Sequence, residues 1–178
     1  MIRINSQIIT QFQSKLLEWY AGNARILPWR DIPSPYRVWI SEIMLQQTRV
    51  KAVLPYFERF LEEVPAIHDL AVLPEDRLMK LWEGLGYYSR AKNLKKAAGI
   101  LVEQYNGELP ADRKELQSLP GIGPYTSGAI ASIAFGAKES AVDGNVLRVM
   151  ARITGSRGEL QDKTIRKEME NFAEMLLP

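Results

Sequence analysis

Apolar residues recur every three or four positions along most of the chain. The clearest runs are Ile8, Ile9, Phe12, Leu16, Leu17 and Tyr20, and later Val50, Val53, Leu54, Phe57 and Leu61. This spacing places apolar side chains along one face of a helix, which can then pack on a core. No segment shows the alternation that is typical of a half-buried strand. The pattern therefore predicts an all-α protein.

Residues that typically begin helices divide this pattern into segments. Ser34-Pro35, Thr48, Leu73-Pro74-Glu75-Asp76 and Ser89 are typical of helix starts, where a capping side chain or a first-turn proline is favourable. The predicted helices cover roughly residues 6 to 21, 35 to 47, 49 to 63, 66 to 72, 74 to 82, 89 to 105, 112 to 118, 124 to 135, 145 to 154 and 162 to 176.

A glycine-rich turn lies between two of these helices, in residues 119–124. Gly121 and Gly123 can take positive φ, so the chain can reverse sharply there and expose its amides. Pro124 suits the first turn of the next helix, whose unpaired N–H groups and dipole favour an anion. The turn is therefore a candidate helix-hairpin-helix grip on DNA phosphate. Taken alone, however, Gly-x-Gly between helices is more often only a tight connection.

A single carboxylate follows the hairpin in an apolar setting. Asp143 stands between Ala141-Val142 and Val146-Leu147, after a helix rich in small residues. Two interpretations remain open, an Asp at the mouth of a buried site or an ordinary helix N-cap.

A second carboxylate interrupts the apolar helix predicted over residues 35 to 47. On a 3.6-residue period Glu42 has Val38, Trp39, Leu45 and Gln46 as neighbours on the same face, and three of these are apolar. Because apolar surroundings disfavour the charged form, Glu42 is a candidate for a carboxyl group that stays protonated near neutral pH, as a general acid must. The alternative is a Glu that points to solvent.

Several other side chains suit contact with bases. Gln46, Gln47 and Thr48 offer amides and a hydroxyl to base edges. Tyr87 follows a second glycine turn and could insert between the bases of a duplex. Trp29 and Arg30 add an indole ring and a planar guanidinium on which a base could stack. Singly, each is more often core packing or surface polarity, and only their number favours a nucleic-acid site.

Composition removes several classes of chemistry. The 178 residues include no Cys, which excludes disulfides, a Cys nucleophile and thiolate-held metal, and the single His makes a histidine metal cluster improbable. A net charge of +2 is weak support for nucleic acid. No secretory signal or membrane span is visible, so a cytoplasmic protein, nucleoid-associated in a bacterium, is expected.

Basic residues gather in one part of the chain. The group consists of Arg77, Lys80, Arg90, Lys92, Lys95 and Lys96. These residues are predicted either to line one surface, with Glu62 and Glu63 elsewhere, or to be ordinary solvent-exposed residues on helix faces.

Five segments together carry a resemblance to a known family. They are Leu27-Pro28-Trp29-Arg30, Ser41-Glu42-Ile43-Met44-Leu45-Gln46-Gln47-Thr48, Gly84-Leu85-Gly86-Tyr87-Tyr88, the hairpin at 119–123, and Val142-Asp143-Gly144-Asn145-Val146. The chain resembles adenine DNA glycosylases of the helix-hairpin-helix superfamily, the MutY type, from about residue 6 to its end. The hairpin with its downstream Asp is typical of the superfamily, and Leu-Gln-Gln-Thr with Tyr125 is typical of the adenine-removing branch.

The resemblance implies a base-excision repair enzyme that removes adenine opposite 8-oxoguanine or guanine. Glu42 would protonate the flipped adenine, Asp143 would stabilise the sugar cation, and Tyr125 and Asn145 would hold these groups. The related glycosylase-lyases carry a Lys where Tyr125 stands, so a monofunctional enzyme is expected. The remaining implied contacts are Trp29, Arg30, Leu45 and Gln46 at the base, Gln47, Thr48 and Tyr87 in the duplex, Gly121, Ile122 and Gly123 on the DNA backbone, and main-chain oxygens of Gln117, Leu119 and Ile122 on an alkali ion.

The implied fold is a six-helix barrel with the hairpin over residues 25–138, and a partial second helical domain from residues 1–24 and 139–178 that carries the catalytic Asp. Full-length family members hold a [4Fe-4S] cluster, and this chain is expected to be truncated before the cysteines that bind it. The resemblance also implies a monomer that binds double-stranded DNA containing an adenine mispair. Two alternatives stay open: a thymine or uracil mismatch glycosylase of the same superfamily, and a non-catalytic hairpin module that only binds DNA.

Overall fold

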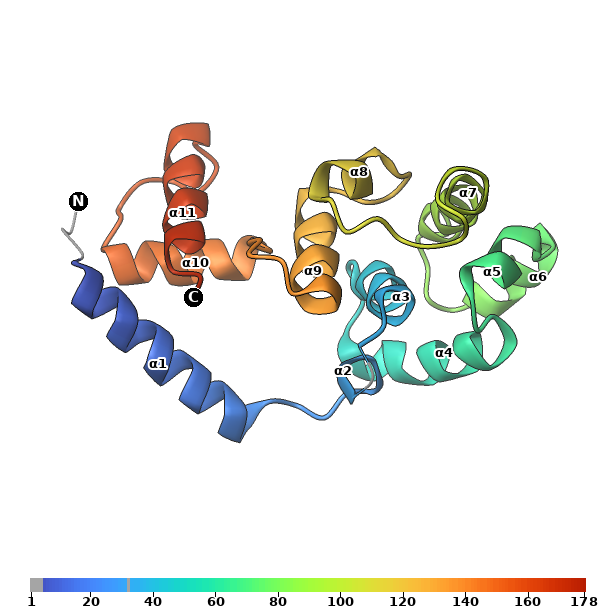
Figure 1. Cartoon of the computed structure of the whole chain (residues 1–178), viewed down its shortest axis with the longest axis horizontal. Helices are drawn as coiled ribbons and strands as arrows, with labels where there is room; N and C mark the ends of the chain where they lie inside the picture. Colours follow the sequence, from blue (N-terminus) through green and yellow to red (C-terminus); the bar gives the residue numbers. More distant parts are fainter. Residues whose placement is uncertain (1–4, 32) are drawn as a thin grey trace. The chain divides into compact units, whose positions relative to one another are not determined.

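The computed structural model describes residues 5–31 and 33–178, and this part of the chain consists of helices and connecting turns without a strand. The helices are α1 Ser6–Asn23, α2 Pro28–Asp31, α3 Pro35–Leu45, α4 Val50–Glu63, α5 Ile67–Val72, α6 Glu75–Trp82, α7 Ser89–Gln104, α8 Arg113–Ser118, α9 Pro124–Phe135, α10 Gly144–Thr154 and α11 Lys163–Met175 (Figure 1). The all-α prediction is therefore confirmed. None of the described helices is both long and apolar enough to cross a membrane.

The chain divides into two compact units with separate cores. One unit is Leu27–Ala137, and the other combines Met1–Ile26 with Lys138–Pro178. The larger core lies wholly in the first unit and the smaller core wholly in the second. Each unit is described by itself below.

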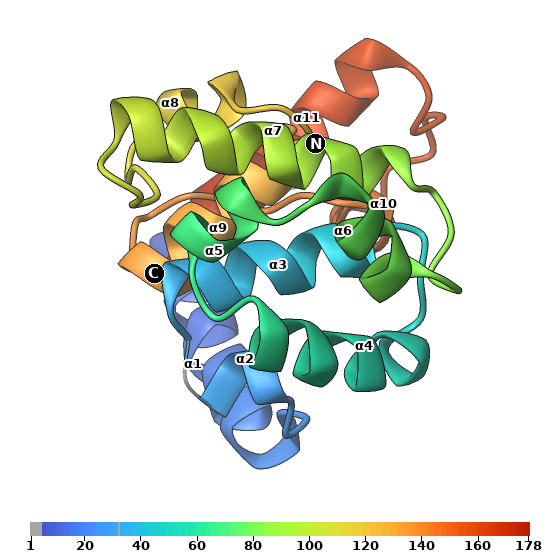
Figure 2. The ribbon, with the colours of Figure 1, turned by 90° about the vertical axis from the view of Figure 1, so that its right-hand side faces the viewer.

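Helix α3 is the centre of the unit Leu27–Ala137. It packs against α4, α7 and α9, and Figure 2 shows it between α7 and α4. Trp39, Ile40 and Met44 of α3 are completely buried, and burial of such a side chain contributes about 1.5–3 kcal/mol relative to exposure. The helix begins where predicted, because the Ser34 side chain accepts a hydrogen bond from the Arg37 amide and Pro35 occupies the first turn.

Small residues allow α9 to approach α3 closely. Gly128, Ala129 and Ala131 are buried along α9, together with Thr126 and Ile130. With little side-chain bulk between the two backbones, α9 can run against α3, and the hairpin that precedes it is thereby attached to the centre of the unit.

The second unit is built on α10 and α11, which pack against each other. Leu147 and Met150 of α10 meet Met169 and Ala173 of α11 in the small core, and the first half of α1 adds apolar side chains to it. Gln13 of α1 also donates hydrogen bonds to the carbonyls of the two leucines before Pro178, at 3.2 and 3.0 Å. Figure 1 shows α11 crossing α10.

The helices differ most from prediction around α2, the end of α3 and the start of α4. The short helix α2 was not predicted, and α3 ends at Leu45 rather than at residue 47. Thr48 is not the N-cap of α4, because Arg49 occupies that position and the Thr48 hydroxyl instead donates to the Gln46 carbonyl at 3.3 Å. Gln47 has a φ of 56°, which no helix can continue through.

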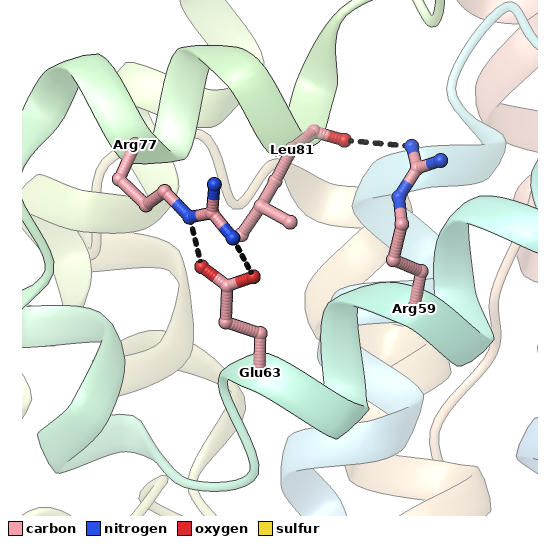
Figure 3. Close-up of polar contacts among 4 residues, drawn as sticks. All are labelled: Arg59, Glu63, Arg77 and Leu81. Atoms are coloured by element: carbon pink, nitrogen blue, oxygen red, sulfur yellow. Dashed lines mark hydrogen bonds and ion pairs between the residues drawn. The ribbon is translucent and has the colours of Figure 1, made fainter.

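Of the six basic residues grouped by the sequence, only Arg90 is buried, whereas Arg77, Lys80, Lys92 and Lys96 are exposed and Lys95 is half-buried. Arg77 forms a two-bond ion pair with Glu63, as Figure 3 shows, so Glu63 does not lie elsewhere. The hydrogen bonds from Arg77 hold the pKa of the Glu63 carboxyl below its usual value. The other contacts are Lys80 with Glu83, Lys92 with Glu75, Lys95 with the carbonyls of Ala71 and Leu73, and Arg90 with buried carbonyls.

Candidate active site

The hairpin connects α8 to α9 and needs glycine at one position only for its backbone. Gly121 has a φ of 82°, and a Cβ there would lie 2.9 Å from the Asn93 Cβ. Gly123 has a φ of −91° and a ψ of −177°, so the prediction of positive φ is wrong for this residue. A Cβ on Gly123 would meet nothing within 4 Å. The fold therefore explains why residue 121 is glycine but gives no reason for glycine at residue 123.

The start of α9 has no side chain that caps its amides. Its N-cap is Gly123, and Pro124 occupies the first turn as predicted. By contrast, Asp112, Asp143 and Asp162 cap α8, α10 and α11 by accepting from two amides each. The first-turn N–H groups of α9 and its positive dipole end thus have the properties of an anion site.

Asp143 is the N-cap of α10. Its Oδ1 accepts hydrogen bonds from the amides of Asn145 and Val146 at 2.9 and 2.8 Å, and its Oδ2 accepts from the Asn145 side chain at 2.8 Å. The Asn145 amide oxygen accepts in turn from Arg148. These contacts hold the half-buried carboxylate in one orientation. The N-cap interpretation is therefore correct, and it is compatible with a chemical role, because Oδ2 keeps lone pairs for another partner.

Glu42 lies in the middle of α3. Its side chain is half-buried, and the residues on either side of it, Ser41 and Ile43, are buried, as are Val38 and Trp39 one turn earlier. The apolar setting that the sequence predicted is thus present. Glu42 belongs to the unit Leu27–Ala137 and Asp143 to the other unit.

Tyr125 is the second residue of α9, directly after the hairpin, and 39% of its surface is exposed. The residue that follows the hairpin and Pro124 is thus partly open to solvent.

Two exposed side chains stand on strained backbone. Gln47 and Tyr87 have φ values of 56° and 49°, and Asn106 is the one other non-glycine residue with positive φ in the described part of the chain. Tyr87 is 58% exposed. Such conformations persist only where the surrounding structure holds them, and they gather at functional sites. The strain adds a reason, absent from the sequence, to single out both residues.

The other predicted base contacts differ in exposure. Trp29 is buried in the core, where its ring meets Phe57 edge-on at a centroid distance of 5.1 Å, so it does not present the free flat face expected. Arg30 is exposed on α2, and Leu45 is half-buried at the end of α3. Gln46 is half-buried, and its amide donates to the Thr126 hydroxyl at 3.5 Å.

The carbonyls predicted to hold an alkali ion lie at the end of α8 and in the turn after it. Gln117 is in the last turn of α8, where carbonyls lack helical partners, and the Leu119 carbonyl accepts from the Ile122 amide at 3.2 Å with one lone pair remaining. Among the described residues no group of three or more His, Cys, Asp or Glu side chains could hold a metal ion.

A cavity of about 440 Å³ lies apart from these residues, between α5, α6 and α7. It is lined by Ala71, Glu75, Lys92, Lys95, Lys96 and Gly99. Two of its three lysines form contacts within the unit, Lys92 with Glu75 and Lys95 with backbone carbonyls.

Arg90 is the member of the basic group that the sequence analysis placed wrongly. It was grouped with surface lysines, but only 7% of it is exposed. A signal was present, because Arg90 shares a helical face with Leu94, Ala97 and Leu101, all of which are buried.

The chain is similar to named DNA glycosylases over nearly all of its length. The chain is 41% identical to the adenine DNA glycosylase of Mus musculus, over 95% of this chain and 35% of that protein. It is 44% identical to the adenine DNA glycosylase of Buchnera aphidicola from Acyrthosiphon pisum, over 94% of this chain and 48% of that protein. The chain thus spans half or less of the length of these curated relatives.

Solved structures share the fold. A thermostable thymine-DNA glycosylase matches with a TM-score of 0.86 and 31% identity, covering 96% of this chain and 78% of that one. A non-covalent complex of endonuclease III with DNA matches with a TM-score of 0.80 and 28% identity, covering 98% and 79%. The model of the family described as HhH-GPD superfamily base excision DNA repair protein matches residues 40–175, and the chain accordingly belongs to this superfamily.

Proposed function

We propose that this protein is a monofunctional DNA glycosylase that removes adenine mispaired with 8-oxoguanine or guanine by hydrolysing the N-glycosidic bond. The observation that carries the proposal is the shared name of the mouse and Buchnera relatives, which align with nearly the whole chain. The proposed substrate is double-stranded DNA that contains the adenine mispair, and the protein binds it as a monomer. In a bacterium the protein would act in the cytoplasm, at the nucleoid.

The hairpin would hold the DNA strand beside the target nucleotide. The uncapped amides at the start of α9 and the absence of a Cβ at Gly123 let a phosphate oxygen approach the backbone between Gly121 and Gly123. An alkali ion on the carbonyls of Gln117, Leu119 and Ile122 would add positive charge facing the same strand. The residues of this chain do not fit an iron–sulfur cluster, because the sequence contains no cysteine.

The chemistry divides between the two carboxyl groups. Adenine flips out of the stack, and Glu42 donates its proton to N7, which makes the base a better leaving group. The bond between C1′ and N9 then breaks, its electron pair leaves with the base, and the carboxylate of Asp143 stabilises the positive charge at the sugar. Glu42, now deprotonated, takes a proton from water as the hydroxyl adds to C1′, leaving an abasic site.

The other residues hold or test the substrate. Asn145 orients Asp143 through the hydrogen bond that it donates, and Tyr125 would contact the same sugar. Arg30, Leu45 and Gln46 would form the wall around adenine, and Gln47, Thr48 and Tyr87 would enter the duplex at the lesion pair. No Lys follows the hairpin at the position of Tyr125, which supports hydrolysis without a Schiff base.

A pair of glycine variants tests the phosphate grip. Gly123→Ala should leave the thermal midpoint almost unchanged, because its φ suits alanine and the added Cβ meets no atom, yet weaken duplex binding by about tenfold to a hundredfold as the phosphate is pushed from the amides. Gly121→Ala should instead destabilise the fold by about 1–2 kcal/mol or more through its positive φ. Thermal unfolding and fluorescence-anisotropy titration measure both. Unchanged DNA affinity in Gly123→Ala would remove the grip from the proposal.

The reaction itself is tested with duplexes that differ only in the central pair. We expect an alkali-labile site at adenine opposite 8-oxoguanine or guanine, and none at adenine opposite thymine. Borohydride should trap no protein–DNA adduct, because hydrolysis passes through no imine. A trapped adduct would contradict the monofunctional assignment.

A second candidate function is removal of thymine from a mismatch with guanine, which the likeness to the thymine-DNA glycosylase favours. Glu42 favours adenine, because a purine leaves readily when N7 is protonated whereas thymine has no such nitrogen. Competition between the two mismatches in one reaction distinguishes them, and preferential release of thymine would overturn the adenine proposal.

A further inference from the structure

A buried guanidinium connects two separate turns of the unit Leu27–Ala137. Arg90, on the first turn of α7, is only 7% exposed. Its Nη1 donates to the carbonyls of Ile43, Met44 and Gln46 at 2.9, 2.8 and 2.6 Å. Its Nη2 donates to the Thr48 hydroxyl and to the carbonyls of Leu85 and Gly86, at 3.2, 3.2 and 3.1 Å.

These acceptors belong to two turns, which we call the glutamine turn (46–48) and the tyrosine turn (84–88). One nitrogen of Arg90 thus binds the end of α3 and the glutamine turn, while the other binds both turns. The guanidinium also lies 5.6 Å from the centroid of the Tyr87 ring and 5.5 Å from that of Trp82, whose indole donates to the Gly86 carbonyl at 3.1 Å.

The two turns carry the strained residues Gln47 and Tyr87, both with positive φ. The hydrogen bonds of Arg90 are contacts that join one turn to the other. Arg90 reaches both at once, and its planar fork can serve carbonyls on two sides, which the point-like ammonium of a lysine cannot do with three donors. Burial lowers the pKa of the guanidinium, and the carbonyl contacts offset part of that desolvation.

We propose that Arg90 is a positioning residue that holds the glutamine and tyrosine turns as one unit, so that Gln47 and Tyr87 reach the duplex in fixed register. The duplex part of this statement rests on the proposed function, whereas the coupling of the two turns does not.

Hydrogen exchange without DNA tests the coupling. Arg90→Lys should speed amide exchange by about tenfold in both turns together, with less than about a twofold change in α4 and α5. The matched control is Arg59→Lys, because Arg59 also lies over an aromatic ring, that of Tyr56, and also donates to a helix-end carbonyl. Its acceptor is the carbonyl of Leu81 in α6, at 3.3 Å, which belongs to neither turn (Figure 3). Faster exchange in one turn only, or throughout the chain, would overturn the proposal.

A double-mutant cycle on duplex binding tests the register. With Arg90 present, Gln47→Ala and Tyr87→Ala should be non-additive by about threefold to tenfold in affinity for the adenine mispair, and in Arg90→Lys the same pair should become additive. Additive losses with Arg90 present overturn the proposal without any Arg90 variant, even if Arg90→Lys does not fold. Persistent coupling in a folded Arg90→Lys protein overturns it as well.

The two measurements separate this inference from the proposed function. If the unaltered protein shows no preference for any mispair, the proposed function fails, and hydrogen exchange still decides whether Arg90 joins the turns. If the protein prefers the adenine mispair but Arg90→Lys does not change amide exchange in the two turns, only the inference about Arg90 fails.

Discussion

Asp143→Asn is expected to lower single-turnover release of adenine by about three powers of ten while the protein remains folded and bound to the duplex. The substitution removes the negative charge that would stabilise the sugar cation. It keeps the N-cap, because asparagine caps helices as well as aspartate and its side-chain oxygen can still accept from the amides of Asn145 and Val146. The apparent Tm should therefore fall by no more than about 3 °C.

Asp162→Asn is the matched control for this substitution. Asp162 caps α11 through the amides of Thr164 and Ile165, in the same way as Asp143 caps α10. Asp162 lies in the same unit as Asp143, and either substitution removes a negative charge from a helix N-terminus, with a similar loss of stability. Adenine release should be unchanged in Asp162→Asn. Near-normal release in Asp143→Asn, measured by rapid quench at enzyme excess, would exclude the carboxylate from the reaction.

The secondary structure was predictable where local chemistry determines it. Ser34 with Pro35, and Pro124 after the glycine turn, begin α3 and α9 as the sequence indicates. Helical periodicity likewise placed α4, whose buried Val53, Phe57 and Phe60 follow one stripe. These features depend on residues within one or two turns of each other, so a single sequence carries them.

The failures of prediction have long-range causes. Helix α3 ends before Gln46 in a turn whose carbonyl binds Arg90, which lies 44 positions along the chain. The prediction for the charged residues failed at two positions for the same reason, since Glu63 pairs with Arg77 of another helix and Arg90 is buried. The spacing of charges along a sequence does not record which partner each one finds in the fold.

In the candidate site, too, the features that depend on sequence neighbours were predictable and those that depend on distant residues were not. Glu42 in an apolar helix and Asp143 before an amphipathic one follow from their immediate neighbours, and the structure bears out both settings. The strain at Gln47 and Tyr87 could not be predicted, because neither residue type prefers positive φ and the conformation depends on distant hydrogen bonds. Trp29 is the opposite case, since its sequence neighbours gave no sign that its ring would be buried against Phe57.

Glu42→Gln is expected to reduce single-turnover adenine release by about 10²- to 10⁴-fold with little change in duplex affinity. Glutamine has the same size as glutamic acid and can still make hydrogen bonds in this half-buried position, but it has no proton to donate to N7 and cannot activate water. Glu58→Gln, an exposed position on α4 in the same unit, is the control and should release adenine at the normal rate.

A modified substrate assigns the lost activity to one proton transfer. In 7-deazaadenine a carbon replaces N7, so this base cannot accept the proton even when Glu42 is present. The unaltered protein should therefore process 7-deazaadenine as poorly as Glu42→Gln processes adenine, and Glu42→Gln should lose little further on the modified base, because both changes remove the same step. If the two losses multiply instead, Glu42 acts elsewhere in the reaction, and the assignment of N7 as its proton acceptor is wrong.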